Sequence, residues 1–575
     1  MKENLETSTV LAIKIDRMVT KIFFFDIVDE KYHLIASSEA RTTSEPPFND
    51  VREGVSHAID RIQQITGRHF YDDEGSLITP MQSDGSGVDH LVITFGFFSK
   101  ISIVSVGLLE SISLESLNKL LATTQLAHLD QIGMNDSRKL EEIIALFTNK
   151  LPDMVVIAGG VNEGAARSIM RQVDMLLFCI KLVPRDKRPY LIFSGNSDFE
   201  PQIRESVGDI TNFQLTQNLR PSINHENLMP AYNMISQVQA EILGHKIGGF
   251  SQLSMHCVLS PLPFSHTTQI MTRFLSLLSK NKEKNVLYID FGKEVISLSA
   301  GNEGNSTFLA EDYSLNYKLN TLLPNLNIGE VIKKSHLPVT EEEVKNFLWD
   351  LSIHPNTIPT TENHLAIEKA VTEILIQNLY RKMLTKWPDF PLTIQQVIVS
   401  GEIFQNHFGY GESLQTILDS FMPDGIVTLY LDQHGILPVL GAIAAINRYL
   451  PIHIMDSSVI ALLAKVIPIK SNAKPGSEIA VVITEFEDGN RIETKIEQGM
   501  IYRLHVPAGQ MVNLYIEPKT KIDIDPATKN FNKGFPLQGG LCGVVIDARG
   551  RPLMLPKDFQ KRKEIQKIWG LQLSD

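Results

Sequence analysis

Apolar residues in this chain gather into short unbroken runs, which alternate with stretches of helical spacing. A continuous apolar run of about four to eight residues is typical of a central strand covered on both faces. Apolar residues three and four apart predict an amphipathic helix instead. Strands are thus expected within residues 10–40, and helices at Val51–Thr66, Thr340–Leu351 and Asn363–Leu384. Strands that alternate with helices predict an α/β protein.

The most informative pattern is Asn285–Ser299, an apolar strand followed by a tight turn and an alternating strand. Asp290 ends the first strand and Gly292 lies in the turn. Glycine lets backbone N–H groups approach an anion, and a carboxylate can hold Mg²⁺ through water. Many hairpins use the same residues without any ligand, so these residues alone leave a phosphate site and a plain hairpin both open.

A second segment, Val10–Asp26, has the same layout. Its first apolar strand ends in Asp16, and Thr20 and Lys21 open a second, very apolar strand. The repetition of strand, aspartate, turn and strand favours a shared role for the two hairpins.

A third element is Gln396–Glu402, a buried strand that ends in Ser400 and Gly401 and leads into a helical pattern. The order of hairpin, hairpin and glycine-ended strand resembles the ATPases of the actin, sugar-kinase and Hsp70 type. In that ribonuclease H-like fold, two hairpins grip the phosphates and the glycine strand backs the adenosine. The resemblance implies ATP and Mg²⁺ as cofactors. The candidate nucleotide-binding residues are Asp16, Thr20, Lys21, Asp290, Gly292, Lys293, Ser400 and Gly401, with Asp16 and Asp290 as candidate metal ligands.

Segments spread over nearly the whole chain resemble one family more closely. This is the MutL family associated with glutamate mutase (also GlmL), which is unrelated to the mismatch-repair protein of that name. The resemblance implies a protein partner, a cobalamin-dependent mutase, and no cobalamin bound to this chain. The matching segments are Asp153–Met170, Arg188–Asn196, Asn218–Pro230, His354–Thr361, Val427–Ile446 and Gly540–Leu553.

The expected organisation is a two-lobed actin-like fold with a β-rich end. The first lobe covers residues 1–250, with a parallel α/β unit inserted at about 151–220, and the second lobe covers 251–455. Past Pro451, short β runs separated by glycine-containing turns predict an all-β domain over 456–575.

The first hairpin departs from the family pattern, which resembles Asp-Phe-Gly-Ser-x-x-Thr-Lys. Asp16, Thr20 and Lys21 match, but Arg17 and Met18 stand where the family has small residues, and the turn is shorter. Side chains at these positions keep the backbone away from a phosphate. Arg17 is expected to face solvent.

The other elements also depart from the family. Lys293 and Glu294 replace a glycine and a small residue in the second hairpin, and Glu402 stands where a second glycine is usual. A carboxylate beside a phosphate is repulsive, and Lys293 offsets it. Phe97 and Phe98 fill a turn that is small and polar in the family. These changes predict a weakened nucleotide site.

Composition excludes several other classes of protein. The formal net charge of −12 argues against a nucleic-acid partner. Three cysteines at isolated positions fit the cytoplasm, and no apolar stretch reaches the ~18 residues of a membrane span. A basic run, Lys561–Lys563, is expected to be a solvated helix face. Asp547 and Arg549 are expected to fix a turn.

These observations predict an accessory protein of the glutamate mutase MutL type with a degenerate nucleotide site. It would act as an ATP-dependent reactivating or assembly factor. The first alternative is a non-catalytic scaffold that keeps the fold and works through protein contacts. A small-molecule kinase of the same fold is the other alternative, although no general base for a hydroxyl stands out.

Overall fold

The computed structural model divides the chain into two compact units. Unit 1 comprises Met1–Thr267 with Pro438–Pro451, and unit 2 comprises Thr268–Leu437 with Ile452–Asp575. The domain boundaries expected from the sequence stay predictions. The structure describes residues 8–96, 101–162, 166–278, 284–292, 295–311, 322–354, 357–388, 390, 393–524, 534–553, 555–556 and 558–573.

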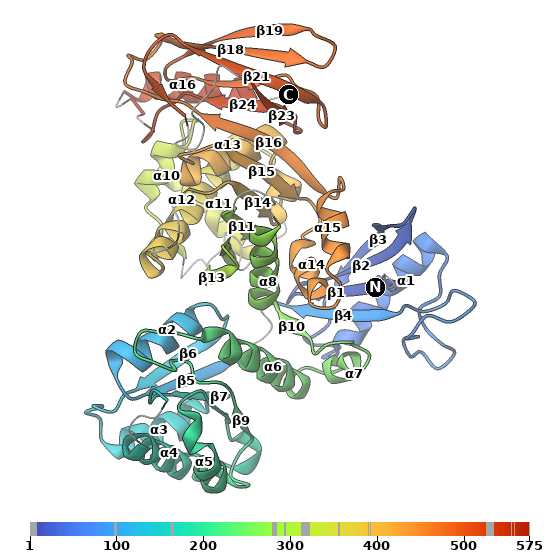
Figure 1. The fold of residues 1–575 in the computed structure, drawn as a ribbon, viewed down its shortest axis with the longest axis vertical. Coiled ribbons are helices and arrows are strands. Elements are labelled where there is room, and N and C mark those ends of the chain that lie inside the picture. The colour runs from blue at the N-terminus through green and yellow to red at the C-terminus, as the bar shows by residue number, and fades with distance from the viewer. Residues whose placement is uncertain are drawn as a thin grey trace. The chain divides into compact units, whose positions relative to one another are not determined.

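Unit 1 contains a five-stranded sheet in the order β3-β2-β1-β4-β10 (Figure 1). The first three strands are antiparallel neighbours, whereas β4 and β10 run parallel to β1. Helix α1 (Val51–Thr66) packs on β2 and β3 and has the bounds that its apolar spacing predicts. The strands are β1 (Val10–Ile15), β2 (Val19–Val28), β3 (Lys31–Arg41), β4 (His90–Phe95) and β10 (Leu262–Pro263).

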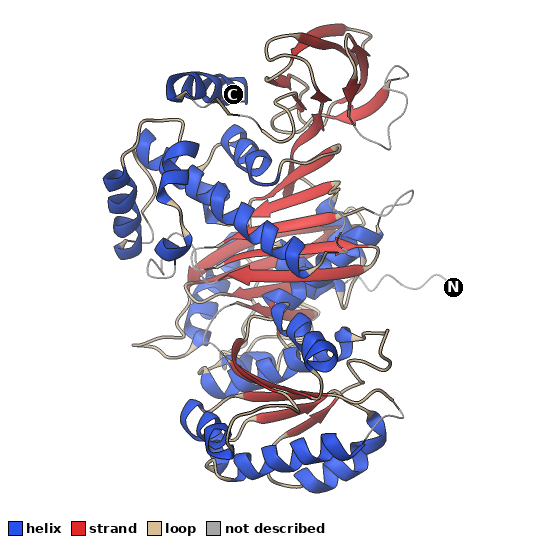
Figure 2. Cartoon of the chain, turned by 90° about the vertical axis from the view of Figure 1, so that its left-hand side faces the viewer, coloured by secondary structure: helices blue, strands red, loops and turns tan. Residues whose placement is uncertain are grey.

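A second sheet of five parallel strands, in the order β6-β5-β7-β8-β9, forms the inserted α/β unit. Figure 2 shows helices on both sides of these strands. The sheet begins at Ser102, so it includes β5 and β6, which precede the expected start at 151. Its elements are β5 (Ser102–Gly107), α2 (Glu115–Ala122), β6 (Ala127–Ile132), α3 (Leu140–Lys150), β7 (Met154–Ala158), α4 (Ala166–Lys181), β8 (Tyr190–Phe193), α5 (Glu200–Val207) and β9 (Phe213–Leu215), followed by α6 (Leu228–Lys246) and α7 (Phe250–Ser254).

Unit 2 is built on an eight-stranded sheet in the order β13-β12-β11-β14-β15-β16-β24-β20. Its first three strands are antiparallel, and β14 and β15 continue parallel to β11. The strands of this sheet are β11 (Val286–Phe291), β12 (Ile296–Asn302), β13 (Asn305–Glu311), β14 (Gln396–Ser400), β15 (Val427–Asp432), β16 (Ile460–Pro468), β20 (Ile501–Leu504) and β24 (Val544–Asp547).

Helices of unit 2 bury their apolar faces against this sheet. The long helix α12 packs on β12 and β13 and on the neighbouring helix α13. The helices expected at Thr340–Leu351 and Asn363–Leu384 are confirmed within two residues at each end. The segment Val439–Tyr449 has a pattern that predicts a single helix, but α14 ends at Ala444 and a separate helix, α15, starts at Tyr449. The helices that follow β10 along the chain are α8 (Phe264–Leu277), α10 (Ile328–Lys334), α11 (Glu341–Ile353), α12 (Glu362–Lys386), α13 (Tyr410–Phe421), α14 (Leu437–Ala444) and α15 (Tyr449–Met455). Of these, α14 lies almost wholly in the Pro438–Pro451 segment of unit 1.

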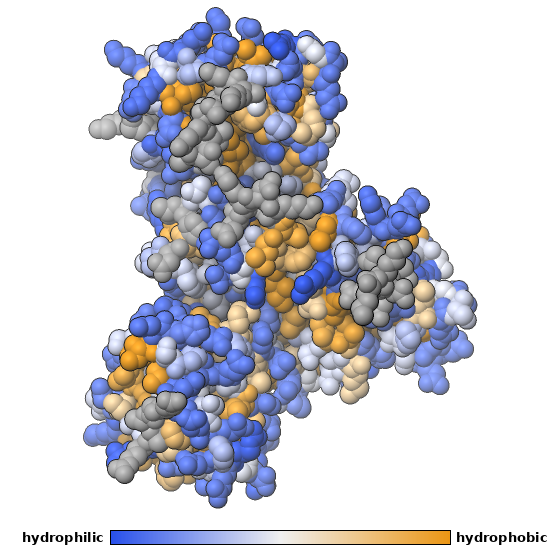
Figure 3. Space-filling model, in the orientation of Figure 1, coloured by the Kyte–Doolittle hydropathy of each residue, from blue (hydrophilic) through white to orange (hydrophobic). Residues whose placement is uncertain are grey.

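The C-terminal part is β-rich, as expected, but its strands are shared between sheets. β16, β24 and β20 extend the large sheet of unit 2, while four others form a separate antiparallel sheet in the order β19-β18-β21-β23. Hydrophilic residues dominate the outer edge of this part in the space-filling view (Figure 3). Its remaining elements are β17 (Lys470–Ser471), β18 (Glu478–Phe486), β19 (Arg491–Glu497), β21 (Met511–Pro518), β22 (Ile522–Asp523), β23 (Phe535–Gln538) and the helix α16 (Phe559–Leu573).

The predicted fold class is confirmed by strand order. The sheets of units 1 and 2 both open with three antiparallel strands and continue with two parallel ones, numbered 3-2-1-4-5 in chain order. This repeat is the arrangement expected for the two lobes of an actin-like fold. Within the described ranges, no helix combines the length and the apolar character that crossing a membrane requires.

Candidate functional site

Four polar side chains form a row across the large sheet of unit 2. Asp290 is the register partner of Ser297 on β12 and of Ser400 on β14. The pairing of β14 with β15 continues this row to Asp432, and the Ser400 hydroxyl donates to the Asp432 carbonyl at 3.4 Å. Register partners point to the same face of a sheet. The row therefore lies at the carboxyl ends of three parallel strands, where open α/β sheets bind ligands.

The row is buried except at Asp290. Ser297, Ser400 and Asp432 are buried, and Asp290 is partly exposed. Tyr288 lies two residues before Asp290 and so faces the same side of β11. Burial, together with the charges of Asp290 and Asp432, raises the pKa of Tyr288 well above its usual value. The floor of the row therefore combines a neutral phenol with nearby carboxylates.

Asp432 has a structural role beside its place in the row. Its carboxylate accepts hydrogen bonds from the backbone N–H groups of Ile436 at 3.0 Å and Leu437 at 2.9 Å. These N–H groups lie at the start of α14 and have no partner within the helix. The carboxylate thus caps α14 and holds the end of β15 in place.

Gly401 brings two backbones into close contact. It has a φ of +112°, and a Cβ at this position would clash with the backbone of Phe291. Any side chain would therefore push the end of β14 away from the end of β11. The position of Ser400 and Gly401 beside Asp290 depends on this glycine.

The segment after Gly401 is anchored from two sides. Gln405 donates through Nε2 to the Asp432 carbonyl at 3.2 Å. His407 Nδ1 lies 3.0 Å from each carboxylate oxygen of the buried Glu368 on α12. Burial raises the pKa of Glu368, and the His407 contact partly opposes this. The backbone that follows the glycine strand is thereby fixed to the core.

The second hairpin turn is only partly described. Gly292 donates its N–H to the Val295 carbonyl at 3.0 Å, which closes the turn. Lys293 and Glu294 lie outside the described residues, as do Phe97 and Phe98 of unit 1. The roles expected for these four residues stay predictions.

In unit 1, the first hairpin turn is closed by its own hydrogen bonds. Asp16 donates its N–H to the Val19 carbonyl at 3.1 Å, and Asp16 Oδ1 accepts from the Arg17 N–H at 2.8 Å. A Cβ on Gly96 would come within 2.7 Å of Asp16 Oδ1. The glycine at the end of β4 therefore leaves the room that the Asp16 carboxylate occupies.

Thr20 does not face a ligand space. Its side chain is fully buried, and its hydroxyl shares a hydrogen bond of 2.8 Å with the Thr42 hydroxyl. Thr42 in turn donates to the Asp16 carbonyl at 2.6 Å. The hydroxyl expected to bind phosphate thus helps to hold the turn.

Lys21 lies in a charged row across the sheet of unit 1. Its neighbours are Glu39 on β3, whose carboxylate is 3.6 Å from Lys21 Nζ, and Lys14 on β1. Lys14 is nearly buried, and its Nζ lies 5.0 Å from the centroid of the Phe264 ring. Two lysines therefore sit side by side on one face, next to the Asp16 turn.

Arg17 is held at the rim of this hairpin. It forms an ion pair with Glu45 at 3.0 Å, and both side chains are exposed. The expectation of a solvent-facing arginine fits this position.

Sequence reasoning missed Lys14 and Asp432, and both carried a signal. Lys14 interrupts an otherwise apolar strand, where a lysine is almost never buried without a reason. Asp432 ends a buried strand just as Asp290 does. Predicted site residues come together within each unit: Asp290, Ser400 and Gly401 in unit 2, and Asp16 and Lys21 in unit 1.

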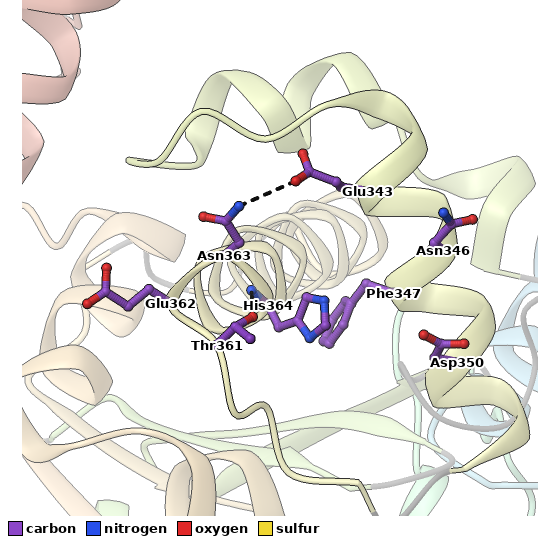
Figure 4. A pocket seen from close by; sticks show the side chains of 8 residues that line it. All are labelled: Glu343, Asn346, Phe347, Asp350, Thr361, Glu362, Asn363 and His364. Atoms are coloured by element: carbon purple, nitrogen blue, oxygen red, sulfur yellow. Dashed lines mark hydrogen bonds between the residues drawn. The ribbon is translucent and has the colours of Figure 1, made fainter.

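A separate hollow of about 440 Å³ lies between the starts of α11 and α12 (Figure 4). Glu343, on its rim, caps α11 by accepting from the Thr340 N–H at 2.7 Å and also accepts from Asn363 at 3.4 Å. The rings of Phe347 and His364 pack side by side, with centroids 4.8 Å apart. These polar groups serve the helix ends and do not converge on one point. Across the described ranges, no three His, Cys, Asp or Glu side chains are placed to hold a metal.

Comparison with solved structures finds similar chains at low sequence identity. Component A of (R)-2-hydroxyglutaryl-CoA dehydratase from Acidaminococcus fermentans is 8% identical, with 76% of this chain and 96% of that chain covered and a TM-score of 0.26. An acetone carboxylase is 10% identical, with coverages of 85% and 81% and a TM-score of 0.35. Plasmodium falciparum glycerol kinase is 11% identical, with coverages of 76% and 88% and a TM-score of 0.29.

Family comparison covers most of the chain. Comparison with curated proteins gives no match. A family model described as MutL protein matches residues 10–459, which include both hairpins, the inserted α/β unit and the glycine-ended strand. The chain therefore belongs to the MutL protein family, which is associated with glutamate mutase and is distinct from the mismatch-repair MutL.

Proposed function

We propose that this protein is a MutL-type accessory protein that binds Mg-ATP weakly through the polar row of unit 2. The observation that carries the proposal is the alignment of Ser297, Asp290, Ser400 and Asp432 at the carboxyl ends of β11, β14 and β15. Ligands of α/β sheets bind at such strand ends. The partly exposed member of the row is a carboxylate, which suits a hydrated cation.

Each residue of the row has a distinct role in this proposal. Asp290 would hold Mg²⁺ through water, and a magnesium ion there would offset phosphate charge. Gly292 and Gly401 place no side chain between the backbone and an anion at the row, while the Gly292 N–H itself closes the hairpin turn. Ser400 would hold the end of β14 against β15, because its hydroxyl donates to the Asp432 carbonyl.

Unit 1 has candidate phosphate ligands of its own. Lys14 and Lys21 are neighbours on one face of its sheet, beside the Asp16 carboxylate. Lysine is a common phosphate ligand. The first hairpin nevertheless offers fewer phosphate ligands than the family pattern. The Thr20 hydroxyl is hydrogen-bonded to Thr42, and Arg17 is paired with Glu45. We infer weak binding for this reason.

The proposed partner is a cobalamin-dependent mutase, which this protein would reactivate or assemble. Family membership supports a protein partner, and the mutase is proposed from the glutamate mutase association of the family. No cobalamin is proposed on this chain. ATP would act by favouring one state of the accessory protein, because a ligand shifts an equilibrium only through its different affinity for the two states.

A scaffold without nucleotide is the second candidate. The hydrogen bonds that join Thr20, Thr42 and Asp16 favour it, because they use the first hairpin's hydroxyl for local structure. On this alternative the fold is kept for protein contacts, and the polar row is only a buried network that caps α14.

The substitution Asp290→Asn separates the two candidates. Saturating Mg-ATP at about 100 times its dissociation constant adds about 2.7 kcal/mol of stability. We expect Mg-ATP to raise the unfolding temperature of the wild type but not of Asp290→Asn, because the neutral amide cannot balance the metal charge. Thermal unfolding with and without nucleotide measures this.

The matched control is Asp488→Asn, which changes an aspartate in the β18–β19 turn of the same unit, where its carboxylate caps a backbone N–H. It should keep the full nucleotide response. An unchanged response in Asp290→Asn would contradict the assigned site, and no response in the wild type would favour the scaffold.

A further inference from the structure

Unit 2 contains a cavity of about 380 Å³ that lies apart from the polar row. It is lined by residues of α10, α12, α13 and α16, all of which are labelled in Figure 1. Ionisable side chains from all four helices line it, among them Lys334, Lys369, Glu373, Asp419 and Lys567. Such a concentration of charge on a concave surface is typical of a binding site.

The carboxylates deep in the cavity already have cationic partners. Glu373 is only 6% exposed, and its carboxylate lies 3.3 Å from Lys334 Nζ. Asp419 lies 2.6 Å from the guanidinium of the buried Arg549. Buried charges are tolerated when they are paired in this way. These two pairs neutralise the floor of the cavity.

The rim has an excess of positive charge. Lys369 donates to the neutral amide of Gln415 at 2.7 Å, and Lys567 is exposed on α16. Burial, with Lys369 and Lys563 nearby, lowers the pKa of His336 to about 4. The rim carboxylate Glu412 accepts from the Gly409 N–H at 2.9 Å and so serves the start of α13.

The start of α13 adds backbone donors to the same wall. Gly409, Tyr410 and Gly411 line the cavity. N–H groups in the first turn of a helix have no carbonyl partner within it, and the helix dipole makes that end positive. The two glycines leave the backbone uncovered by their own side chains. The Gly409 N–H is taken by Glu412, and the other N–H groups of this turn complement the lysines and favour the same charge of ligand.

We propose that this cavity binds a small ligand through an oxyanion group, a carboxylate or a phosphate, held by Lys369, Lys567 and the start of α13. The ligand contacts α12 and α13 on one side and the C-terminal helix α16 on the other. Gln566 of α16 already donates to the Lys334 carbonyl at 3.2 Å. That bond joins α16 to α10, and an anion between Lys369 and Lys567 adds a link between α16 and α12.

The test is lysine footprinting by mass spectrometry with sulfate and with acetate as probes, at constant ionic strength in chloride. Sulfate represents a tetrahedral oxyanion and acetate a carboxylate. We expect millimolar probe to slow the acylation of Lys369 and Lys567 several-fold, while the exposed Lys345 of α11 reacts as before. Whichever probe protects at the lower concentration identifies the oxyanion.

Lys369→Gln should raise the dissociation constant of the preferred probe at least tenfold. This constant is measured from the protection of Lys567 against acylation. The control Lys345→Gln should bind as the wild type does. Both variants are first compared with the wild type in chloride to verify that they fold. Equal reactivity of Lys369 with and without both probes in the wild type would overturn the proposal, as would unchanged affinity in a folded Lys369→Gln protein.

The pH dependence gives an independent readout. Burial raises the pKa of Glu373 to about 7, with Asp419 acting in the same direction and Lys334 and Lys369 opposing it. Between pH 8 and pH 6 this group gains a proton, so the cavity becomes more positive and the probe should bind more tightly. Neither probe titrates in this range. Glu373→Gln should remove this dependence, and an unchanged dependence would contradict the assigned cavity.

Discussion

Among the residues of the candidate site, Gly401 is at a position where only glycine fits. The end of β14 reaches Asp290 only because no side chain separates it from the backbone of Phe291. We predict that Gly401→Ala lowers the unfolding temperature and removes the response to Mg-ATP. The backbone strain of a non-glycine residue at such a φ is about 1–3 kcal/mol, and the clash adds to it. Thermal unfolding with and without nucleotide measures both effects.

Gly489→Ala is the matched control for the backbone strain. Gly489 also has a positive φ, of +83°, but a Cβ there would meet nothing within 4 Å. This variant should be strained without a clash and should keep its nucleotide response. Equal behaviour of the two variants would show that the contact of Gly401 with Phe291 does not shape the site.

Asp547 is part of a buried charge network with Arg549 and Arg551. Its carboxylate accepts from Arg549 Nε at 3.0 Å and from Arg551 Nη2 at 2.8 Å. Burial alone would raise its pKa, but the two arginines hold the pKa well below its usual range. The expected turn is confirmed, and Arg549 also reaches Asp419 on α13. The turn therefore ties β24 to the wall of the cavity.

We predict that Asp547→Asn lowers the free energy of unfolding of unit 2 by roughly 3–5 kcal/mol, because it leaves buried guanidinium groups without a counter-charge. A lowered folded-state pKa contributes stability above the unfolded value near 3.8, and this is lost as the pH falls further. The free energy of unfolding should therefore fall less on acidification in Asp547→Asn than in the wild type. All three tryptophans lie in unit 2, so urea unfolding followed by tryptophan fluorescence reports on it.

An exposed ion pair provides the comparison. Glu485 and Arg491 on β18 and β19 are paired at 2.5 Å, but solvent screens them. Glu485→Gln should change the urea midpoint far less than Asp547→Asn does. Similar midpoints for the two variants would contradict the importance of the buried network.

Residue patterns predicted much of the candidate site but not the direction of each side chain. Asp290 and Ser400 were expected together because each comes near the end of a buried strand that leads into a glycine, and the register places them side by side. Thr20 matched the family motif, yet its hydroxyl points into the turn. Lys14 and Asp432 stand out in the sequence as a lysine within an apolar strand and an aspartate at a strand end, but their neighbours Lys21 and Ser400 follow only from the register of the strands.

At the scale of elements, local periodicity predicted most strands and helices, because it depends on neighbouring residues alone. The helices α1, α11 and α12 follow their apolar spacing closely. Sheet membership depends on partners far along the chain, and this is where expectation and structure differ. The apolar residues of β5 predict a strand, but its place in the inserted sheet depends on its pairing with β7.

The C-terminal strands show the same limit of local patterns. Their turn spacing predicted an all-β domain, but β16 pairs with β15 on one edge and with β24 on the other. Strands of the β-rich end therefore extend the large sheet, and four others form a separate sheet. No local pattern distinguishes a strand that extends an existing sheet from one that starts a new sheet.

At the scale of the whole molecule, two findings agree. The 3-2-1-4-5 strand order occurs in both units, and the MutL family model spans residues 10–459. Both were anticipated by the order of two hairpins and a glycine-ended strand. The formal net charge of −12 fits a partner other than nucleic acid. The central claim that follows is that the polar row of unit 2 still binds nucleotide.

Calorimetric titration of the full-length wild-type protein with ATP, with and without Mg²⁺, tests that claim most directly. We predict saturable heat with Mg-ATP at a dissociation constant in the millimolar range, and weaker binding when Mg²⁺ is removed, because the Asp290 carboxylate then repels the phosphates. The absence of saturable heat up to high millimolar Mg-ATP would contradict the account. The polar row would then be a structural network of a scaffold protein.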